Sequence, residues 1–353
     1  AVIFAGSEKY AELTLPEFPA KDTAELKKLA LDLHNKITAE SEYIIDGTSA
    51  TVIQNSTRIV LINSHGLELS TDVGVVGMAA EAVVSKDGEN QAAFALESGF
   101  GEELVGNLAK KATADALAKI GAGEIESGKY DVIFCGKQMK DLLSTFSSVF
   151  SGRSANLGLS LLKGKEGEKI AADCVTLIDD PQKEGSATQT AFDGEGVATY
   201  TKNVIENGVL KTLLYDIASA DKVGKESTGN GQRGSYASPV SVAPYHFYLA
   251  GGKLSDDELL ASMGDGIYIT ELKGLHAGAN SVTGDFSIES AGFRVRDGRK
   301  CEAIKSFTVA GNFFELIKSV EALATDVKFG FAGGFTVFGA PDTLIRQMSV
   351  AGK

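Results

Sequence analysis

The sequence predicts an α+β protein: an N-terminal α/β-type domain with an antiparallel meander, and a larger, mostly antiparallel β domain with inserted helices. The first reason is the predicted order of helix, strands, helix and then a long strand-rich region, which differs from the β-α-β alternation of a parallel sheet. The second is the recurrence of two-residue hairpin signals between strand-like runs. These signals are Asp87-Gly88, Asn207-Gly208 and Asp297-Gly298.

The N-terminal domain is predicted to begin with a helix over residues 22–40. Asp22 and Glu25 form a capping box, and apolar residues then recur at helical spacing. These residues are Leu26, Leu29, Ala30, Leu33 and Ile37. Strand-like sequence follows over residues 49–100, and a second helix is expected over residues 102–120.

A domain boundary is expected after this second helix. The stretch GAGEIESGKY is rich in glycine and charge, as linkers are. We therefore place the boundary near Gly128, between an N-terminal domain at 1–127 and a C-terminal domain at 128–353. The first residues, AVIFAG, are typical of the inside of a domain, so we expect further sequence upstream.

The C-terminal domain is predicted to open with a short buried strand at 130–135, followed by a helix at 137–150. Short helices are also expected at 255–263 and 312–324, since each starts with a capping residue and a glutamate three positions later. The rest of this domain is strand-rich, and the sequence contains no internal repeat.

The acidic composition argues against two kinds of partner. The net charge is −13, whereas a nucleic-acid-binding protein normally carries a basic surface. Lys110-Lys111 is an isolated basic pair on a predicted helix. We therefore expect no direct contact with nucleic acid and no binding to an anionic membrane.

The cysteines and the hydropathy pattern favour the cytoplasm. Cys135, Cys174 and Cys301 are far apart and form no CxxC pair, which fits a reducing compartment better than a disulfide framework. The sequence shows no signal peptide and no apolar run of the roughly 20 residues that a membrane helix needs.

The histidines are single and scattered, at His34, His65, His246 and His276. A zinc site needs several imidazole, thiolate or carboxylate groups that converge, often from a close pair on one helix. The sequence contains no such pair, so no self-contained zinc-hydrolase site is predicted. A dispersed site that uses His65, His276 or Asp285 stays open as an alternative.

The segment at 229–234, GNGQRG, matches a dinucleotide-binding pattern by letters only. That pattern needs a strand before it and a helix after it, whereas SYASPVSVAP follows here and cannot begin a helix. The glycines therefore favour a close backbone approach, to another strand or to an extended ligand. A serine-hydrolase triad is not favoured either, because Ser144, Ser147, Ser148 and Ser151 have no histidine near them in the sequence.

The segment at 274–293, GLHAGANSVTGDFSIESAGF, gathers polar groups between two strand-like runs. Its hydrogen-bonding side chains include Asn280, Thr283, Asp285 and Ser287. Gly278 and Gly284 leave backbone accessible beside them. The composition indicates either an elaborate turn fixed by Asx-type bonds or a ligand-binding loop.

Several segments together carry a family resemblance. They include RIVLINSHGL, FDGEGVATYTKNVIENGVLKTLLYD, ESTGNG, GIYITELKGLHAGANSVTGDFSIESAGF and APDTLIRQMSVAGK. Their order and spacing resemble the TldD/PmbA family (modulator of DNA gyrase), and specifically its PmbA (TldE) branch, from about residue 20 to the C-terminus. The family usually has a further N-terminal module, which is expected to be missing or truncated in this sequence.

The resemblance implies a cytosolic metalloprotease system in which TldD-type and PmbA-type chains pair. TldD-type chains carry an HExxxH helix, whose histidines hold the metal and whose glutamate activates water. The corresponding helix here is the one at 137–150, and Ser144, Thr145 and Val149 align with the motif. Because Asp141 is the only His, Asp or Glu on this helix, we expect no metal or cofactor in this chain and zinc only in a TldD-type partner.

We therefore expect a non-catalytic subunit that pairs with a TldD-type chain, or forms a homodimer, and helps to hold an unfolded peptide. Strand edges bind extended peptides through backbone hydrogen bonds. The expected contact residues are Gly229, Asn230, Gly231, Asn280, Thr283, Gly284, Asp285 and Ser287. Two alternatives stay open: an autonomous peptidase or hydrolase with a dispersed site, and a homo-oligomeric peptide-binding scaffold.

Overall fold

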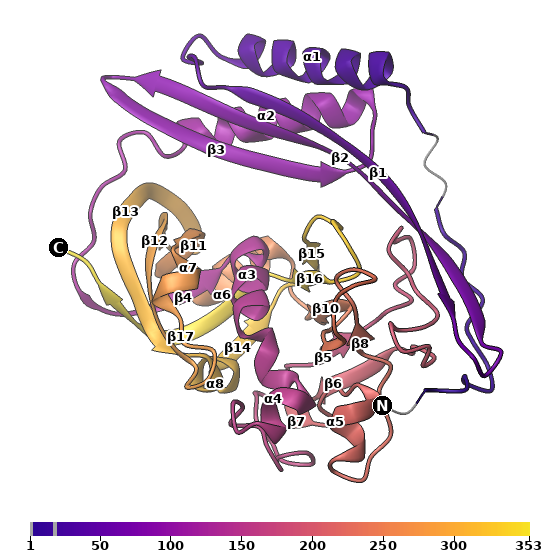
Figure 1. The fold of residues 1–353 in the computed structure, drawn as a ribbon. Helices are drawn as coiled ribbons and strands as arrows, with labels where there is room; N and C mark the ends of the chain where they lie inside the picture. Colours follow the sequence, from indigo (N-terminus) through magenta and orange to yellow (C-terminus); the bar gives the residue numbers. More distant parts are fainter. Residues whose placement is uncertain (1–2, 17–19) are drawn as a thin grey trace.

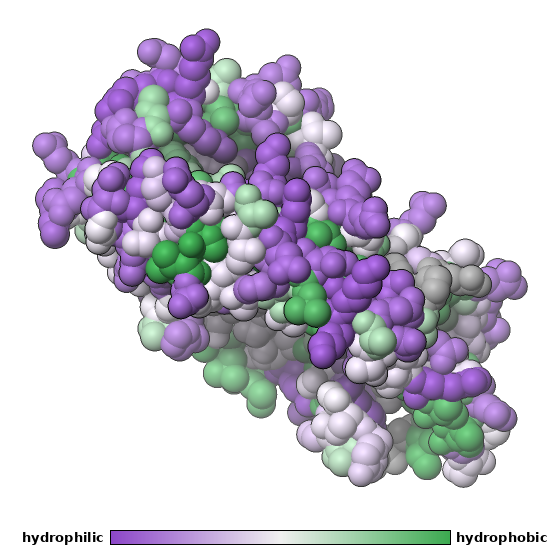
Figure 2. Space-filling model, turned by 90° about the horizontal axis from the view of Figure 1, so that it is seen from above, coloured by the Kyte–Doolittle hydropathy of each residue, from purple (hydrophilic) through white to green (hydrophobic). Residues whose placement is uncertain are grey.

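The structure, a computed structural model, describes residues 3–16 and 20–353. A three-stranded antiparallel sheet carries two helices on one face, and a larger strand-rich part lies beside its opposite face (Figure 1). The strand-rich part also contains helices between its strands, so the predicted α+β class is confirmed. Seen from the side of the two N-terminal helices, the molecular surface is mostly hydrophilic, with hydrophobic residues in small separate groups (Figure 2).

The N-terminal sheet has the strand order β1-β2-β3, and both neighbouring pairs are antiparallel. Its strands are β1 (Ser49–Ile62), β2 (Glu68–Lys86) and β3 (Glu89–Ser98). The predicted turn joins β2 to β3, with φ of 53° at Asp87 and 79° at Gly88. Positive φ at both central residues is what a type I′ hairpin turn requires.

Helices α1 (Thr23–Glu40) and α2 (Glu102–Leu117) pack against each other and against this sheet. Asp22 and Glu25 make the predicted capping box. Helix α2 ends three residues before the predicted Ile120, because residues 118–121 form turns. The apolar core between the helices and the sheet includes Leu33, Ile37, Met78, Ala80, Ala82, Val84, Val105, Leu108 and Ala112.

The C-terminal part contains a sheet with the order β13-β12-β11-β4-β17-β14, in which β13 also pairs with β17. Five of its strands therefore close on themselves. The strands are β4 (Gly128–Phe134), β11 (Gly266–Lys273), β12 (Asp285–Arg296), β13 (Arg299–Asn312), β14 (Val320–Leu323) and β17 (Thr343–Ala351). Only the β4–β11 pair is parallel within this sheet, and the predicted Asp297-Gly298 turn joins β12 to β13.

A second six-stranded sheet, with the order β15-β16-β10-β5-β6-β7, lies beside the first. Its strands are β5 (Leu177–Asp179), β6 (Lys202–Glu206), β7 (Val209–Leu210), β10 (His246–Leu249), β15 (Lys328–Phe329) and β16 (Val337–Ala340). The predicted Asn207-Gly208 turn joins β6 to β7. A separate two-stranded ribbon consists of β8 (Gly231–Gln232) and β9 (Ser241–Val242).

Helix α3 (Gly136–Phe146) follows β4 and narrows into a 3-10 helix, η1 (Ser147–Phe150), so the predicted helix at 137–150 changes its winding near its end. The shorter helices are α4 (Gly152–Asn156), α5 (Ile217–Asp221), α6 (Asp256–Met263), α7 (Leu275–Gly278) and α8 (Phe313–Lys318). The prediction of one helix over 312–324 was wrong beyond Lys318. Val320 begins β14, whose pairing with β17 replaces the helical hydrogen bonds.

The main apolar core lies around α3. Met139, Leu142, Leu143 and Phe146 form its buried face and pack with side chains of both C-terminal sheets. Within the described residues, no helix combines the length and the apolar character needed to span a bilayer.

Candidate functional site

The end of α3 and η1 carry Ser144, Thr145 and Val149, the three positions that the family resemblance assigns to the metal motif. Ser144 is exposed, and Thr145 donates a hydrogen bond from Oγ1 to the backbone oxygen of Asp141 at 2.8 Å. Val149 lies in η1 and is fully buried. Since Ser144 faces solvent and Val149 faces the core, the structure does not bring these positions together in one pocket.

Stacked aromatic rings fix this end of α3 next to the start of β12. The ring of Phe146 stacks on Phe313 with a centroid distance of 4.7 Å and lies 6.2 Å from the ring of Phe286. Phe286 is the second residue of β12, and α7 also contacts α3. The polar segment at 274–293 is therefore a neighbour of α3.

Within this polar segment, a turn precedes β12, and hydrogen bonds to Asn280 fix the shape of that turn. Its Oδ1 accepts hydrogen bonds from the backbone N–H of Val282 at 2.9 Å and of Thr283 at 3.2 Å. The backbone N–H of Gly284 donates to the oxygen of Asn280 at 2.8 Å. Such Asx-type bonds fix the turn, as one of the two sequence interpretations expected.

Asn312 holds the other side of the turn. Its Nδ2 donates to the backbone oxygen of Thr283 at 2.9 Å and to Asp285 Oδ1 at 2.8 Å. The hydrogen bond from Asn312, together with that involving Thr283, lowers the pKa of the Asp285 carboxyl. The side chains of four predicted contact residues are nevertheless exposed. They are Asn280, Thr283, Asp285 and Ser287, whereas Gly284 is buried.

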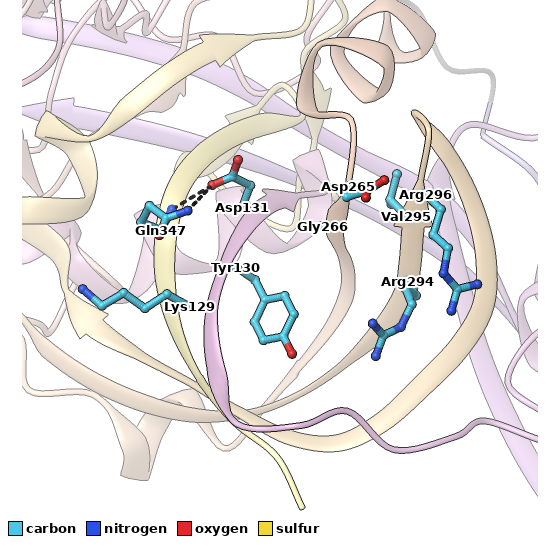
Figure 3. Close-up of a pocket in the computed structure, with 9 residues that line it drawn as sticks. All are labelled: Lys129, Tyr130, Asp131, Asp265, Gly266, Arg294, Val295, Arg296 and Gln347. Atoms are coloured by element: carbon cyan, nitrogen blue, oxygen red, sulfur yellow. Dashed lines mark hydrogen bonds between the residues drawn. The ribbon is translucent and has the colours of Figure 1, made fainter.

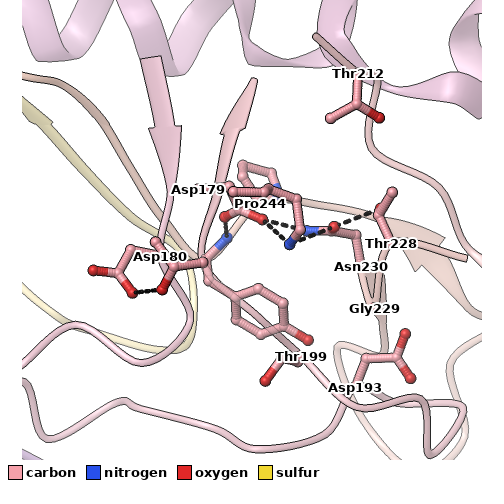
Figure 4. A network of polar contacts seen from close by, with 12 residues as sticks. Asp179, Asp180, Asp193, Thr199, Thr212, Thr228, Gly229, Asn230 and Pro244 are labelled. Carbon is pink, nitrogen blue, oxygen red and sulfur yellow. Dashed lines mark hydrogen bonds and ion pairs between the residues drawn. The ribbon is translucent and has the colours of Figure 1, made fainter. Parts of the chain in front are cut away.

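The other predicted contact segment, at 229–231, lies inside the domain. Asn230 is fully buried, and its Nδ2 donates to Asp179 Oδ2 at 2.7 Å (Figure 4). Its Oδ1 accepts from Thr228 Oγ1 at 2.7 Å and from Lys202 Nζ at 3.3 Å. Lys202 also pairs with Asp179 Oδ2 at 3.1 Å, so the buried charges neutralise each other.

The glycines on either side of Asn230 permit a close backbone approach to residues 193–198. A Cβ on Gly229 would lie 2.7 Å from the backbone oxygen of Ala198, and one on Gly231 would lie 2.6 Å from Glu195 Oε2. The approach is thus to another part of the same chain. Gly229, Asn230 and Gly231 are not among the peptide contacts that we propose below, because all three are buried inside the domain.

Asp193, in the same region, is a buried carboxyl with an unusual proton affinity. Burial raises its pKa to about 6, against the opposing effect of hydrogen bonds from the backbone N–H groups of Glu195, Gly231 and Val197. The sequence pattern gave no signal for this group or for the Asp179–Lys202 pair, since their partners come from distant segments.

The four histidines lie on four separate segments of the structure. His65 lies in the turn between β1 and β2, at the far end of that hairpin. His276 lies on α7 and Asp285 on β12, and both elements are far from this turn (Figure 1). His34 is half-buried on α1 and His246 is buried on β10. Within residues 3–16 and 20–353, no group of three or more His, Cys, Asp or Glu side chains is arranged to hold a metal ion.

A pocket of about 250 Å³ opens at one end of the closed sheet (Figure 3). Several of its polar groups are engaged within the chain. Asp131 accepts from Arg346 Nη1 at 2.7 Å and from Gln347 Nε2 at 3.1 Å. Arg294 is 3.3 Å from a carboxylate oxygen of Glu302. The sequence did not indicate this pocket, and its paired charges give it no clear preference for one ligand.

Comparison with known proteins gives consistent matches along the chain. Residues 16–120 match the PmbA/TldA metallopeptidase central domain, and residues 127–352 match the C-terminal domain of the same family. A metalloprotease of Methanothermobacter thermautotrophicus is 29% identical over 93% of this chain and 74% of its own length. A metalloprotease PmbA homologue of Haemophilus influenzae is 27% identical over 87% of this chain and 66% of its own length.

Solved structures agree with these sequence matches. A Thermotoga maritima protein described as a modulator of DNA gyrase superposes with a TM-score of 0.90 and 31% identity, over 99% of this chain and 80% of that one. TldE of Thermococcus kodakarensis shares the fold, with a TM-score of 0.82 and 24% identity over 98% of this chain and 80% of its own. The fold and both domain matches show that this chain belongs to the PmbA/TldD metallopeptidase family.

Proposed function

We propose that this chain is a PmbA/TldE-type subunit that pairs with a TldD-type metallopeptidase chain and helps to hold an unfolded peptide, without a metal site of its own. The observation that carries the proposal is the end of α3. Ser144 and Thr145 offer hydroxyls, and Val149 is a buried apolar residue, where the resemblance to TldD-type chains aligns the His-Glu pair and the second histidine.

The start of β12 and its turn are the proposed peptide contacts. Side chains two residues apart on a strand share a face, so Asp285 and Ser287 point outward together while Phe286 and Ile288 point into the core. Asn280 and Thr283 extend this polar row into the turn. Because Asn312 fixes the turn, these groups are already arranged to bind backbone and side-chain groups of an extended peptide.

The cytoplasm is the proposed compartment. Cys135, Cys174 and Cys301 are all free thiols, and the last two are exposed. Exposed thiols of this kind are typical of a reducing environment.

The main experiment compares the chain purified alone with the chain co-expressed with a TldD-type chain from the same cell. The readouts are bound zinc, the mass of the complex in solution and the cleavage of unfolded peptides. We expect cleavage that a chelator abolishes in the complex, and neither stoichiometric zinc nor metal-dependent cleavage by the chain alone. Stoichiometric zinc in the isolated chain, with cleavage lost in a Ser144→Ala/Thr145→Ala variant, would favour an autonomous peptidase.

The peptide contacts need a separate test in the complex. Ser287→Ala and Asp285→Asn should raise KM for peptide several-fold and leave kcat within about twofold, since they remove binding that the ground state and the transition state share equally. Ser70→Ala is the matched control, because this exposed serine lies on β2 in the N-terminal sheet. Unchanged KM in both test variants would rule out this surface as the peptide contact.

A further inference from the structure

A serine and a histidine outside the proposed peptide surface lie within hydrogen-bonding distance. His246 is the first residue of β10 and is buried, and its Nε2 lies 2.7 Å from Ser186 Oγ. Its Nδ1 lies 3.0 Å from the backbone oxygen of Asp180. Sixty residues separate Ser186 from His246, so sequence spacing could not reveal this pair.

The contacts of the ring determine which nitrogen carries the hydrogen. A backbone carbonyl can only accept, so Nδ1 of His246 must donate to Asp180. In the neutral imidazole, Nε2 is then an acceptor, and the hydroxyl of Ser186 donates to it. Burial lowers the pKa of His246, which favours the neutral imidazole with a free lone pair on Nε2.

Thr188 fixes the position of the serine hydroxyl. Its backbone N–H donates to Ser186 Oγ at 3.2 Å, and its own Oγ1 lies 3.1 Å from that oxygen. A hydroxyl held against a neutral imidazole, whose other nitrogen is bound by a third group, has the arrangement of an activated nucleophile.

An aromatic and cationic surface lies on the same sheet. Tyr248 shares its face of β10 with His246, and its ring contacts that of Phe329 edge-on at 5.1 Å. Lys183, three residues before Ser186, places Nζ 5.8 Å and 5.6 Å from the centroids of these two rings. Ser186 is half-buried and Phe329 is 39% exposed, so the serine and one aromatic ring of this surface are both partly open to solvent.

We propose that Ser186 is a nucleophile that His246 activates toward carboxylic esters with an apolar or aromatic acyl group. Ser186 Oγ forms a bond to the carbonyl carbon while His246 Nε2 takes the hydroxyl proton. The bond from that carbon to the ester oxygen breaks, and the alcohol leaves with the proton. Water then attacks the acyl-serine, so that the free acid departs and the hydroxyl of Ser186 is restored.

The test uses a fluorophosphonate probe on the purified full chain, with the modified residue identified by mass spectrometry. We expect one probe per chain, on Ser186, and hydrolysis of p-nitrophenyl butyrate that a chelator does not affect. Ser186→Ala should abolish both. Ser235→Ala is the matched control and should retain both, because the hydroxyl of Ser235 contacts Ser238 Oγ instead of a histidine.

A second variant addresses the role of the base. His246→Gln should slow labelling by about 100-fold or more, the usual size of a general-base contribution. Should that variant fail to fold, Ser186→Cys provides another readout: an imidazole-paired thiol should react with iodoacetamide near pH 6, much faster than the exposed Cys174 and Cys301.

An unlabelled Ser186 in the folded chain would overturn the proposal, and so would labelling at the same rate in folded His246→Gln. The result is independent of the proposed peptidase role. Probe labelling needs no TldD-type partner and no metal, whereas the peptidase test depends on both.

Discussion

The ring of Phe331 occupies the space that a side chain on Gly77 would need. A Cβ on Gly77 would lie 2.3 Å from Cε2 of Phe331 and 3.0 Å from the backbone oxygen of Glu97. Gly77 lies on β2, and Phe331 belongs to the loop between β15 and β16. This contact therefore joins the N-terminal sheet to the loop that follows β15, the strand that carries Phe329.

Gly77→Ala should destabilise this junction. Overpacking a close contact typically costs about 1–3 kcal/mol, and the new methyl group must displace the ring of Phe331. Gly74→Ala, on the same strand, is the control: a Cβ there meets no atom within 4 Å, so stability should change by less than about 0.5 kcal/mol. Urea unfolding and limited proteolysis of the 330–336 loop would measure both effects. Equal stability of the two variants would show that the ring moves away without cost.

The buried pair of Lys202 and Asp179 should matter far more than an exposed pair. Removing one partner of a buried ion pair leaves the other charge uncompensated and costs about 3–5 kcal/mol, so Lys202→Met should lower the free energy of unfolding by that order. Lys211→Met breaks the exposed contact with Glu206 at 3.3 Å and should change the stability far less, because solvent screens an exposed pair. Chemical denaturation of both variants gives the comparison. A similar loss in both would mean that water reaches the buried pair.

Asp193 should titrate near pH 6. Because burial raises its pKa from the usual 3.8 to about 6 in the folded state, the folded protein binds this proton more tightly than the unfolded chain does. The contribution to stability is fully present below about pH 4 and is lost as the pH rises through about 6. A tenfold change in proton affinity corresponds to about 1.4 kcal/mol, so the loss is of the order of 2–4 kcal/mol.

Carbon-13 NMR of the labelled aspartate carboxyls would follow this titration directly. In Asp193→Asn, the decline in the free energy of unfolding between pH 4 and 6 should be smaller than in the unchanged protein by the same amount. A pKa near 4 for the Asp193 carboxyl would contradict this effect of burial.

Features that depend on neighbouring residues were predictable from the sequence. The capping box of Asp22 and Glu25, and that of Ser255 and Glu258, form as expected, because their hydrogen bonds span only three residues. The three hairpin turns also form, since Asp or Asn before Gly tolerates the positive φ that such turns need. The PmbA/TldD family was evident from the combination of short segments.

Features that depend on distant pairing were not predictable. Local capping signals favoured a helix through Val320, but pairing with β17 makes that residue a strand. The glycines around Asn230 left two partners open, and only the folded chain shows that they approach residues 193–198. The pair of Ser186 and His246 gave no signal for the same reason, because antiparallel pairing of β5 with β10 brings their segments together.

Substitution of the HExxxH residues into this helix should not create a metal site. We expect that Ser144→His/Thr145→Glu/Val149→His fails to bind zinc stoichiometrically, because position 144 faces solvent while position 149 lies in the core, where η1 has replaced the α-helix. Three ligands must converge within about 2 Å of one ion, and this backbone separates them.

The same variant should also be less stable. An imidazole in place of the fully buried Val149 lacks a hydrogen-bond partner and exceeds the available volume, which should cost about 2–5 kcal/mol. The Ser144→His/Thr145→Glu double variant is the control. Its free energy of unfolding should lie within about 1 kcal/mol of that of the unchanged chain, since Ser144 is exposed and the hydroxyl of Thr145 makes one hydrogen bond, to a backbone oxygen. Zinc analysis and thermal unfolding measure the two outcomes. One tightly bound zinc per chain in the triple variant would mean that η1 can rewind and that this backbone can hold a metal ion.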